Sequence, residues 1–186
     1  MKPRKLVLWF AILVLSMLTI TVQSAQTENR RFPLPDHGFL KLSMPVGWKH
    51  QLRQPPERLP PTIMLQAGSG PAFAILITPI WPARADIKPQ TPAEMRQQVE
   101  TAVERIKPQA VEKHIKVNEL RGVSGVGYYY AATDKAPKPG EFKYLTQGML
   151  RVDNLLVTFT ILTNDGQQGV VTDALTMLRG AVHQRK

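Results

Sequence analysis

Regular alternation of apolar and polar residues predicts most of the strands of this chain. Residues 39–44, for example, place leucine or methionine at every second position. A period of two is typical of a strand with one buried and one solvated face, and a short continuous apolar run indicates a strand buried on both faces. These patterns predict eight strands: residues 39–44, 48–53, 62–67, 72–80, 115–121, 123–133, 142–151 and 155–162.

Two amphipathic helices are predicted between and after these strands. Thr91-Pro92-Ala93-Glu94 forms a capping box with proline at the first helical position, and Pro108 ends the helix that it opens. Thr163-Asn164-Asp165-Gly166 offers cap candidates for a final helix with basic residues at its end. The two apolar stripes are Met95, Val99, Ala102, Val103 and Ile106, then Val170, Val171, Ala174, Leu175, Leu178 and Val182.

The order of these elements predicts the fold class. Four strands, a helix, four strands and a second helix, with hairpin connections such as Asp153-Asn154, favour an α+β fold in which helices flank an antiparallel sheet. We expect a signal peptide at residues 1–24 and one domain at residues 38–186. Residues 25–37 are polar and contain Pro33 and Pro35, so we expect them to form a linker.

The first two dozen residues are typical of a secretory signal peptide. Three basic residues among the first five precede the uncharged residues 6–22. The unbroken apolar run at residues 6–15 is shorter than the roughly 20 residues of a comfortable membrane span. We therefore expect cleavage after Ser24 and a periplasmic or secreted protein. The alternative is an anchor in the inner membrane formed by an uncleaved N-terminal helix.

The expected mature chain is moderately basic and has no cysteine, so disulfides, thiolate chemistry and a lipoprotein anchor are excluded. The signal peptide takes three of the 24 basic residues and none of the 14 acidic ones, which leaves 21 against 14 and a net charge of +7. This charge favours an envelope protein or an anionic envelope component as partner, while export argues against nucleic acid. No stable membrane insertion is expected after cleavage, and the oligomeric state stays open.

Several local strings together resemble a known group of proteins. They are Leu42-Ser43-Met44-Pro45 followed by Trp48, Val126-Gly127-Tyr128-Tyr129, and the closing hairpin with its amphipathic helix. The chain resembles the PsbP-like and DcrB-like group of exported or organelle-lumen domains, whose fold is related to that of a Ran-binding nuclear import factor. The resemblance covers roughly residues 38–182. It implies an αβα sandwich around an antiparallel sheet, used as a binding or assembly module, with no shared catalytic constellation.

No motif in the sequence predicts catalysis, a metal or a cofactor. Gly122-Val123-Ser124-Gly125 lacks the glycine two residues after serine that a nucleophile elbow requires. The four histidines include no pair three or four residues apart. A calcium loop that starts at Asp165 would need glutamate at its twelfth position, where Thr176 stands. We therefore expect no catalytic residues, no metal ligands and no cofactor.

Aromatic and basic residues are the better candidates for a ligand or partner surface. Trp81 stands at a strand end, and Trp48 opens a strand whose other face carries Lys49 and Arg53. Alternation sends Tyr129 to the face opposite its two tyrosine neighbours. Core packing is the simpler interpretation of both tryptophans.

Three functions are consistent with these observations. The first is a non-enzymatic binding or scaffold module of the bacterial cell envelope. The second is a periplasmic hydrolase or transferase with a dispersed site, which requires a deep pocket where at least two of its candidate residues meet. The third is a carrier of an apolar ligand, which requires a cavity between sheet and helix. The candidates for the dispersed site are His37, His50, His114, Asp36, Asp134 and Asp153.

Overall fold

The structure is a computed structural model that describes residues 26–56, 59–82 and 88–185. The expected signal peptide at residues 1–24 lies outside these ranges. The strands are β1 (Thr27–Leu34), β2 (Gly38–Pro45), β3 (Trp48–Arg53), β4 (Thr62–Ala67), β5 (Ala74–Ile80), β6 (Asn118–Gly122), β7 (Gly125–Thr133), β8 (Tyr144–Val152), β9 (Leu155–Thr163) and β10 (Val182–Gln184). The helices are α1 (Pro92–Ile106), the 3₁₀ turn η1 (Lys107–Gln109) and α2 (Gln168–Arg179).

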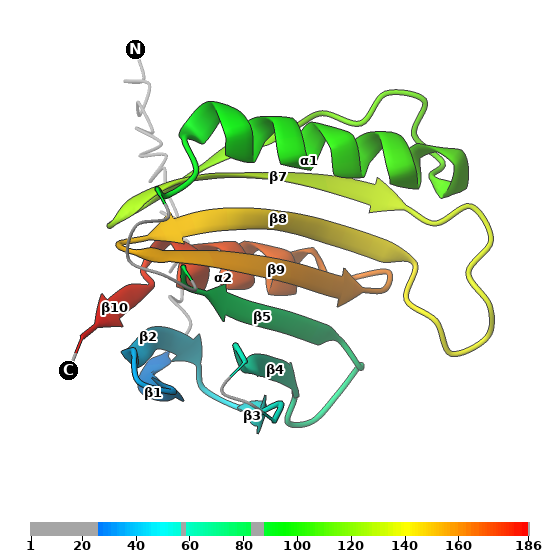
Figure 1. Cartoon of the computed structure of the whole chain (residues 1–186). Coiled ribbons are helices and arrows are strands. Elements are labelled where there is room, and N and C mark those ends of the chain that lie inside the picture. Colours follow the sequence, from blue (N-terminus) through cyan, green and yellow to red (C-terminus); the bar gives the residue numbers. More distant parts are fainter. Residues whose placement is uncertain (1–25, 57–58, 83–87, 186) are drawn as a thin grey trace, which may run out of the picture.

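A seven-stranded antiparallel sheet forms the centre of the molecule (Figure 1). Its strand order is β3-β4-β5-β9-β8-β7-β6, and every neighbouring pair is antiparallel. A smaller sheet has the order β1-β2-β10. The predicted α+β class, an antiparallel sheet flanked by helices, is confirmed.

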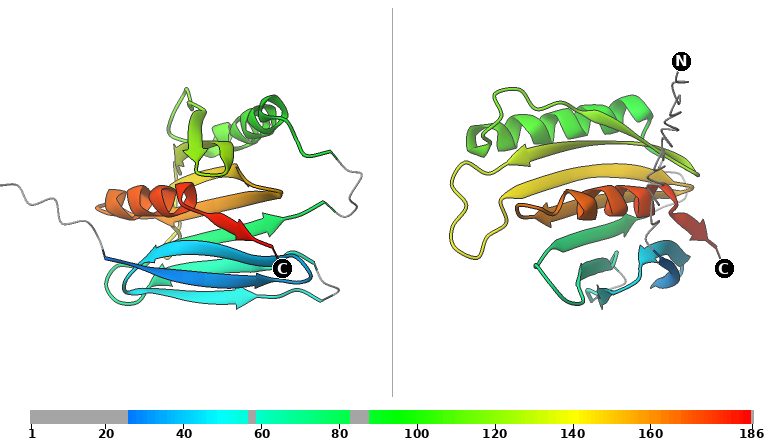
Figure 2. Two further views of the ribbon diagram at one scale, coloured as in Figure 1. Left: turned by 90° about the vertical axis from the view of Figure 1, so that its left-hand side faces the viewer. Right: turned by 180° about the vertical axis from the view of Figure 1, so that it is seen from behind.

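The two helices lie on opposite faces of the large sheet (Figure 2). Helix α1 covers β7 and β8, where Val99 and Val103 pack on the buried Tyr130. On the other face, α2 packs against β2, β6 and β9. The main hydrophobic core lies between the large sheet, α2 and the small sheet. The structure therefore has two separate cores, one on each face of the large sheet.

Helix α1 forms as its sequence predicts. The Thr91 hydroxyl accepts a hydrogen bond from the Glu94 backbone N–H at 3.2 Å, and the Glu94 carboxylate accepts one from the Thr91 N–H at 2.7 Å. The two hydrogen bonds give partners to two backbone N–H groups at the helix start, which have no partner within the helix itself. The helix ends at Ile106, shortly before Pro108.

The expected linker at residues 25–37 is instead largely a strand. Strand β1 pairs with β2 along its whole length, from Thr27 opposite Pro45 to Leu34 opposite Gly38. Phe32 and Leu34 are buried in the main core, which gives the segment an apolar face. Because β1 is an edge strand, Pro33 is tolerated there even though it has no N–H to donate.

The C-terminal segment also differs from its prediction. The expected helix included Val182, but α2 ends at Arg179 and residues 182–184 form β10, which pairs with β2. Gly180 follows α2 directly and is compatible with a helix end. Strand β2 pairs with β1 on one side only, and β10 provides hydrogen-bond partners for backbone groups on its other side. A pairing between segments so distant in sequence leaves no local signal.

The start of α2 is not capped by the residues that were expected. Its N-cap is Gln167, which makes no side-chain cap hydrogen bond. Asn164 and Asp165 bind the beginning of β8 instead. The Asn164 side-chain oxygen accepts from the Lys143 N–H at 3.0 Å, and the Asp165 carboxylate accepts from the Tyr144 hydroxyl at 2.6 Å. The polar residues of this turn therefore connect two strand ends rather than close a helix.

Candidate functional site

Helix α1 leaves much of its own face of the large sheet uncovered. Strands β4, β5 and β9 continue the sheet beyond the edge of the helix, and their outward side chains stay only partly buried. A hollow of about 600 Å³ lies there, between α1 and the exposed strands. We call it the sheet groove. Its size falls within the roughly 300–1,000 Å³ range of ligand pockets.

Hydroxyl and amide groups form the floor of the sheet groove. The hydroxyls of Thr62 on β4 and Thr78 on β5 are 3.0 Å apart and share a hydrogen bond. On the neighbouring strands, the Gln147 amide donates to the Thr160 hydroxyl at 3.2 Å. Thr158, beside Thr78 in the register, completes the row. Four adjacent strands thus present a continuous line of neutral hydrogen-bonding groups.

One end of this line is fixed from beneath α1. The hydroxyl of the buried Tyr130 donates to the Gln147 side-chain oxygen at 2.7 Å. Burial raises the pKa of Tyr130, so the phenol stays neutral and remains a donor at physiological pH. Because Tyr130 holds the oxygen of Gln147, the amide nitrogen is directed to Thr160 and toward the groove. The packing of α1 therefore orients a polar group of the site.

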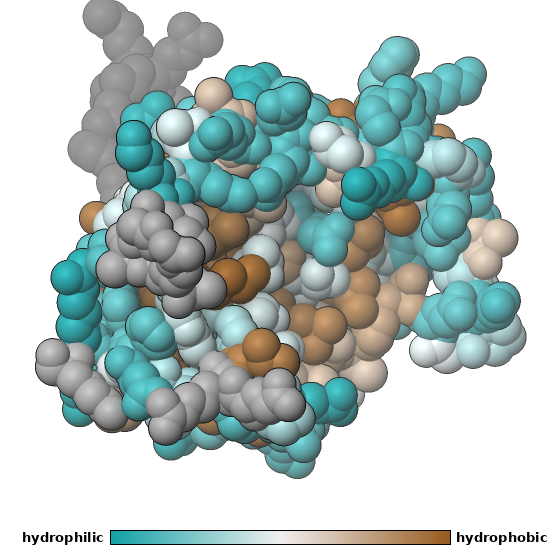
Figure 3. All heavy atoms as spheres, in the orientation of Figure 1, coloured by the Kyte–Doolittle hydropathy of each residue, from teal (hydrophilic) through white to brown (hydrophobic). Residues whose placement is uncertain are grey.

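Apolar side chains surround the polar floor. Leu76 of β5 and Met149 of β8 line the groove together with Ala102 and Ile106 of α1. Figure 3 shows hydrophobic residues gathered in a hollow on this face of the molecule, below α1. Farther along β5 the side chain of Ile80 is 37% exposed. The groove is thus amphipathic and suits a ligand with both apolar and hydrogen-bonding groups.

Three basic side chains lie on the face of the sheet groove, and we call them the basic rim. Arg105 is exposed and lines the groove on the side of α1, whereas Lys49 and Arg53 belong to the edge strand β3 and are not among its lining residues. On the opposite side, Lys49 is paired with Gln66 and Arg53 with Thr62 in the β3–β4 register. Because directly paired residues project to the same face, both basic side chains of β3 lie on the face of the groove.

A second hollow of about 740 Å³ continues the groove toward the start of α1. It shares Gln98, Arg105 and Met149 with the sheet groove, and Lys88 and Glu94 lie at its far end. The Arg151 guanidinium donates to the Gln90 carbonyl and so fixes the segment that leads into α1. The two hollows are therefore neighbours along α1.

The structure places the five predicted surface residues in different surroundings. Lys49 and Arg53 are exposed beside the sheet groove, as just described. Trp48 packs on Phe73, with ring centroids 4.9 Å apart, and Trp81 stacks on His37 at 4.5 Å.

Both tryptophans and Tyr129 are half-buried against the main core, on the side of the sheet away from α1 or at its end. These contacts give the two tryptophans a packing role. A role of Trp48, Trp81 or Tyr129 in partner binding stays a prediction, and the proposal below does not depend on it.

The six candidate residues for a dispersed catalytic site line neither the sheet groove nor the hollow that continues it. His50 packs edge-on against Phe32, and the Asp134 carboxylate accepts from the nearby Ala136 N–H. Within the part of the chain that the structure describes, no group of three His, Asp or Glu side chains could hold a metal ion.

The threonine row was missed because its signal is spread over three separate segments. Within any one strand the signal is no more than one or two threonines on the solvent side, such as Thr158 and Thr160 in β9. Threonine is common in strands, so this pattern is ordinary. The row exists only after β4, β5, β9 and β8 are placed side by side. Alternation could have assigned each threonine to a face, but strand order and register were needed to join them.

Comparison with known proteins defines the class of fold. No protein-family model and no curated protein matches the chain. The structure has the PsbP-like α+β fold, which confirms the resemblance inferred from sequence. It is similar to the solution structure of cyanobacterial PsbP (CyanoP) from Synechocystis sp. PCC 6803, with a TM-score of 0.50 and 11% identity over 88% of this chain and 96% of that one. At this identity the likeness establishes the fold alone.

Proposed function

We propose that this chain is an exported, non-enzymatic binding module of the bacterial cell envelope. In this proposal the sheet groove binds an extended peptide segment of another envelope protein. The observation that carries the proposal is the line of neutral hydrogen-bonding groups across four strands, set between apolar walls and a basic rim. Such a surface offers partners to peptide N–H and C=O groups and contacts for apolar side chains.

The dimensions of the floor fit a short stretch of extended chain. The row runs from Thr62 on β4 to Gln147 on β8, across three strand spacings of about 4.8 Å each, or about 14 Å in all. An extended peptide rises about 3.3 Å per residue, so about four residues would lie over it. A segment crossing the strands could alternate polar contacts below with apolar contacts to Leu76 and Met149.

Charge indicates which kind of segment would be preferred. Arg105, Lys49 and Arg53 lie at the rim, and the expected mature chain is itself basic. A partner segment with acidic side chains beside its apolar ones would be attracted over about 8 Å at physiological salt. This argument favours an acidic loop or terminus over a basic one.

The two other functions suggested by the sequence have less support. The carrier hypothesis required a cavity between sheet and helix. Met95 of α1 and Leu175 of α2 are buried, and the hollow beside α1 has a floor of hydroxyl and amide groups, which suits a peptide better than a purely apolar ligand. The hydrolase or transferase hypothesis required convergence of its candidate residues, and they line neither the sheet groove nor the hollow that continues it. Both observations leave the binding module as the best-supported function.

Export and location belong to the same proposal. A signal peptide cleaved after Ser24 would deliver the domain to the periplasm or the medium, and an uncleaved start would anchor it in the inner membrane. No helix in the described ranges is long and apolar enough to cross a membrane. Mass spectrometry of the protein isolated from cells would decide between the two, because a mature N-terminus at Ala25 supports cleavage and one at the first residues supports the anchor.

Site-directed photocrosslinking in cells tests the binding surface. The photoreactive amino acid p-benzoylphenylalanine is placed at Leu76 or Thr158 in the groove, and at Glu104 on the solvent side of α1 as the matched control. We expect one discrete crosslinked envelope protein from both groove positions and at least about tenfold less from the control. Equal crosslinking from all three positions would contradict the proposal.

A synthetic peptide from the crosslinked region then provides a direct binding test. Its affinity for the purified domain should fall about tenfold in Arg105→Glu, because a like charge replaces an attractive one at the rim. Glu104→Gln, next to it in sequence but outside the groove lining, should bind as the unaltered domain does. A peptide without acidic residues that binds equally well would argue against the charge-based part of the proposal.

A further inference from the structure

A separate pocket of about 310 Å³ lies where β7 ends, β8 begins, β9 ends and α2 starts. We call it the α2 pocket. It shares no lining residue with the sheet groove. Its volume is at the lower end of the range for small-molecule sites. We infer that the α2 pocket binds a small organic molecule that carries a protonated amine and an apolar portion.

A held carboxylate provides the charge in this pocket. The Glu112 carboxylate accepts from the Thr133 N–H at 2.9 Å and from the Thr133 hydroxyl at 2.6 Å. Partial burial alone would raise the pKa of Glu112, but the two hydrogen bonds from Thr133, together with the backbone of Glu112 itself, outweigh it and lower the pKa, so the group is ionised at neutral pH.

This carboxylate has lone pairs left for a ligand. Each of its oxygens accepts a single hydrogen bond from Thr133. Among the described residues, no basic side chain forms an ion pair with Glu112. A protonated amine would supply both a charge and N–H donors to this carboxylate.

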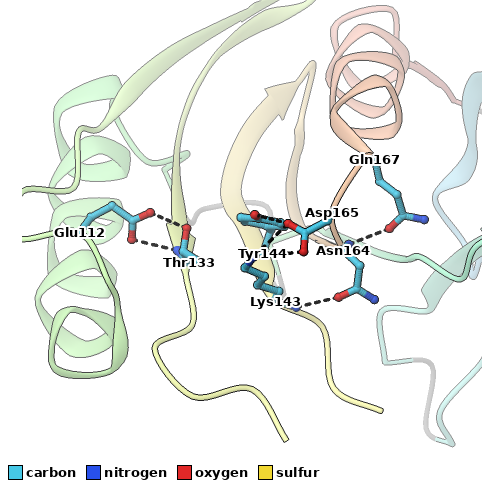
Figure 4. Close-up of polar contacts among 7 residues, drawn as sticks. All are labelled: Glu112, Thr133, Lys143, Tyr144, Asn164, Asp165 and Gln167. Atoms are coloured by element: carbon cyan, nitrogen blue, oxygen red, sulfur yellow. Dashed lines mark hydrogen bonds and ion pairs between the residues drawn. The ribbon is translucent and has the colours of Figure 1, made fainter. Parts of the chain in front are cut away.

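The other charges near the pocket are already paired. The Asp165 carboxylate accepts from the Tyr144 hydroxyl at 2.6 Å and from the Lys143 ammonium at 3.0 Å, and these contacts lower its pKa (Figure 4). Figure 4 shows Glu112 pointing to Thr133 on one side and this network on the other, with Asn164 and Gln167 nearby. Lys143 therefore does not neutralise Glu112, and an anionic ligand would meet an unbalanced negative charge.

Two buried threonines give the pocket a second polar feature. Thr146 on β8 is 4% exposed and Thr163 on β9 is 3% exposed, and both line the pocket. Neither side-chain hydroxyl is hydrogen-bonded to a described residue, and neither is among the fully buried polar atoms that lack a partner, so both oxygens keep some accessible surface. A ligand in the pocket would have access to these hydroxyls as donors or acceptors.

Apolar side chains complete the wall. The side chains of Val171 of α2 and Ala131 of β7 line the pocket, whereas Leu145 and Ala132 border it through their backbone because their side chains pack in the core under α1. These residues give contact area to a short hydrocarbon or aromatic portion but leave no room for a long chain. The expected ligand is therefore small, positively charged at one end and apolar at the other.

A matched set of three probes tests the ligand class. We would add 2-phenylethylamine, 2-phenylethanol or phenylacetate to the mature protein at pH 7 and follow its amide and methyl NMR signals. The three probes are similar in size and differ in charge. We expect saturable shifts of the Thr146, Ala131 and Val171 signals with the amine, binding about tenfold weaker with the alcohol, and none with the anion.

Two variants and one control locate the binding. Glu112→Gln removes the charge and Thr146→Val removes one hydroxyl at nearly constant volume, so each should weaken amine binding, by about tenfold for the first. Thr160→Val makes the same change on the opposite face of β9, in the sheet groove, and should leave amine binding unaltered.

The inference is overturned if the alcohol or the anion binds as tightly as the amine, if no pocket signal shifts, or if both pocket variants bind the amine as the unaltered protein does. None of these outcomes affects the crosslinking from Leu76 and Thr158, because the two sites have no residue in common. Should Glu112→Gln lose its dispersed NMR spectrum, Thr146→Val still decides the result.

Discussion

At the scale of single residues, the clearest electrostatic feature is the pair of hydrogen bonds that the Glu112 carboxylate accepts from Thr133. It joins the loop after η1 to the last residue of β7, 21 positions away. The pKa of Glu112 is lowered in the folded protein, so the carboxylate is stabilised by folding. A group of this kind contributes stability above its unfolded pKa, and the contribution is lost as the pH falls through its folded pKa.

Glu112→Gln is therefore expected to destabilise the protein at neutral pH and much less in acid. The loss at pH 7 should be about 1 kcal/mol, the usual net value of a hydrogen bond, because the site is only partly buried. Urea unfolding at pH 7 and at pH 3 measures the difference. Glu100→Gln, which removes an exposed ion pair with Arg96, is the control and should cost no more than about 0.5 kcal/mol. A loss that is the same at both pH values would contradict this explanation.

Replacement of two glycines by alanine is expected to change the stability of the fold in opposite directions. A Cβ added at Gly148 would collide with the Tyr128 backbone oxygen of the neighbouring strand, whereas one added at Gly169, near the start of α2, would meet nothing within 4 Å. Gly148→Ala should thus cost about 2 to 3 kcal/mol, because two backbones must separate. Gly169→Ala should stabilise slightly, by up to about 1 kcal/mol, because alanine restricts the unfolded chain. Thermal unfolding of both variants checks the contrast in sign.

At the scale of elements, sequence reasoning succeeded where the signal was local. The capping box of Thr91 and Glu94 fixed the start of α1, and Asp153, with φ 52°, occupies the left-handed conformation that its hairpin turn requires. It failed for β1 and β10, which are strands only because each pairs with β2. The prolines in β1 predicted a linker, and the helical spacing of apolar residues up to Val182 predicted a longer helix. The pairing with β2 decided both cases, and the local pattern does not reveal it.

Phe32→Ala tests whether β1 is part of the folded domain. The Phe32 ring is 3% exposed and meets the His50 ring edge-on at 5.4 Å. Truncation of a buried phenylalanine should cost about 3 kcal/mol or more, since it leaves a cavity in the main core. Arg30→Ala, in the same strand but exposed, should change stability by less than about 0.5 kcal/mol. Equal and negligible effects in urea unfolding would mean that this segment acts as the linker first expected.

At the scale of the whole molecule, the two faces of one sheet carry different properties. The face under α2 is closed by the main core, while the face of α1 stays half open and holds the sheet groove. The groove depends on the order β4-β5-β9-β8, in which two strands from the first half of the chain lie beside two from the second half. Lys49 and Arg53 could be predicted as surface residues from alternation alone. The position of Arg53 opposite Thr62, and of Lys49 opposite Gln66, required the register between strands.

The basic rim gives the whole molecule a testable salt response. Binding of an acidic peptide to the groove should weaken about tenfold between 0.1 M and 1 M NaCl, because the Debye length falls from about 10 Å to about 3 Å. In Arg53→Gln the weakening should be smaller, since less attraction remains to be screened. Amine binding in the α2 pocket involves a partly buried, directly contacting charge and should respond less to salt. Titration calorimetry of both ligands at the two salt concentrations makes the comparison. If the affinity of the groove does not change with salt, the apolar walls provide the binding energy, and Arg105, Lys49 and Arg53 do not.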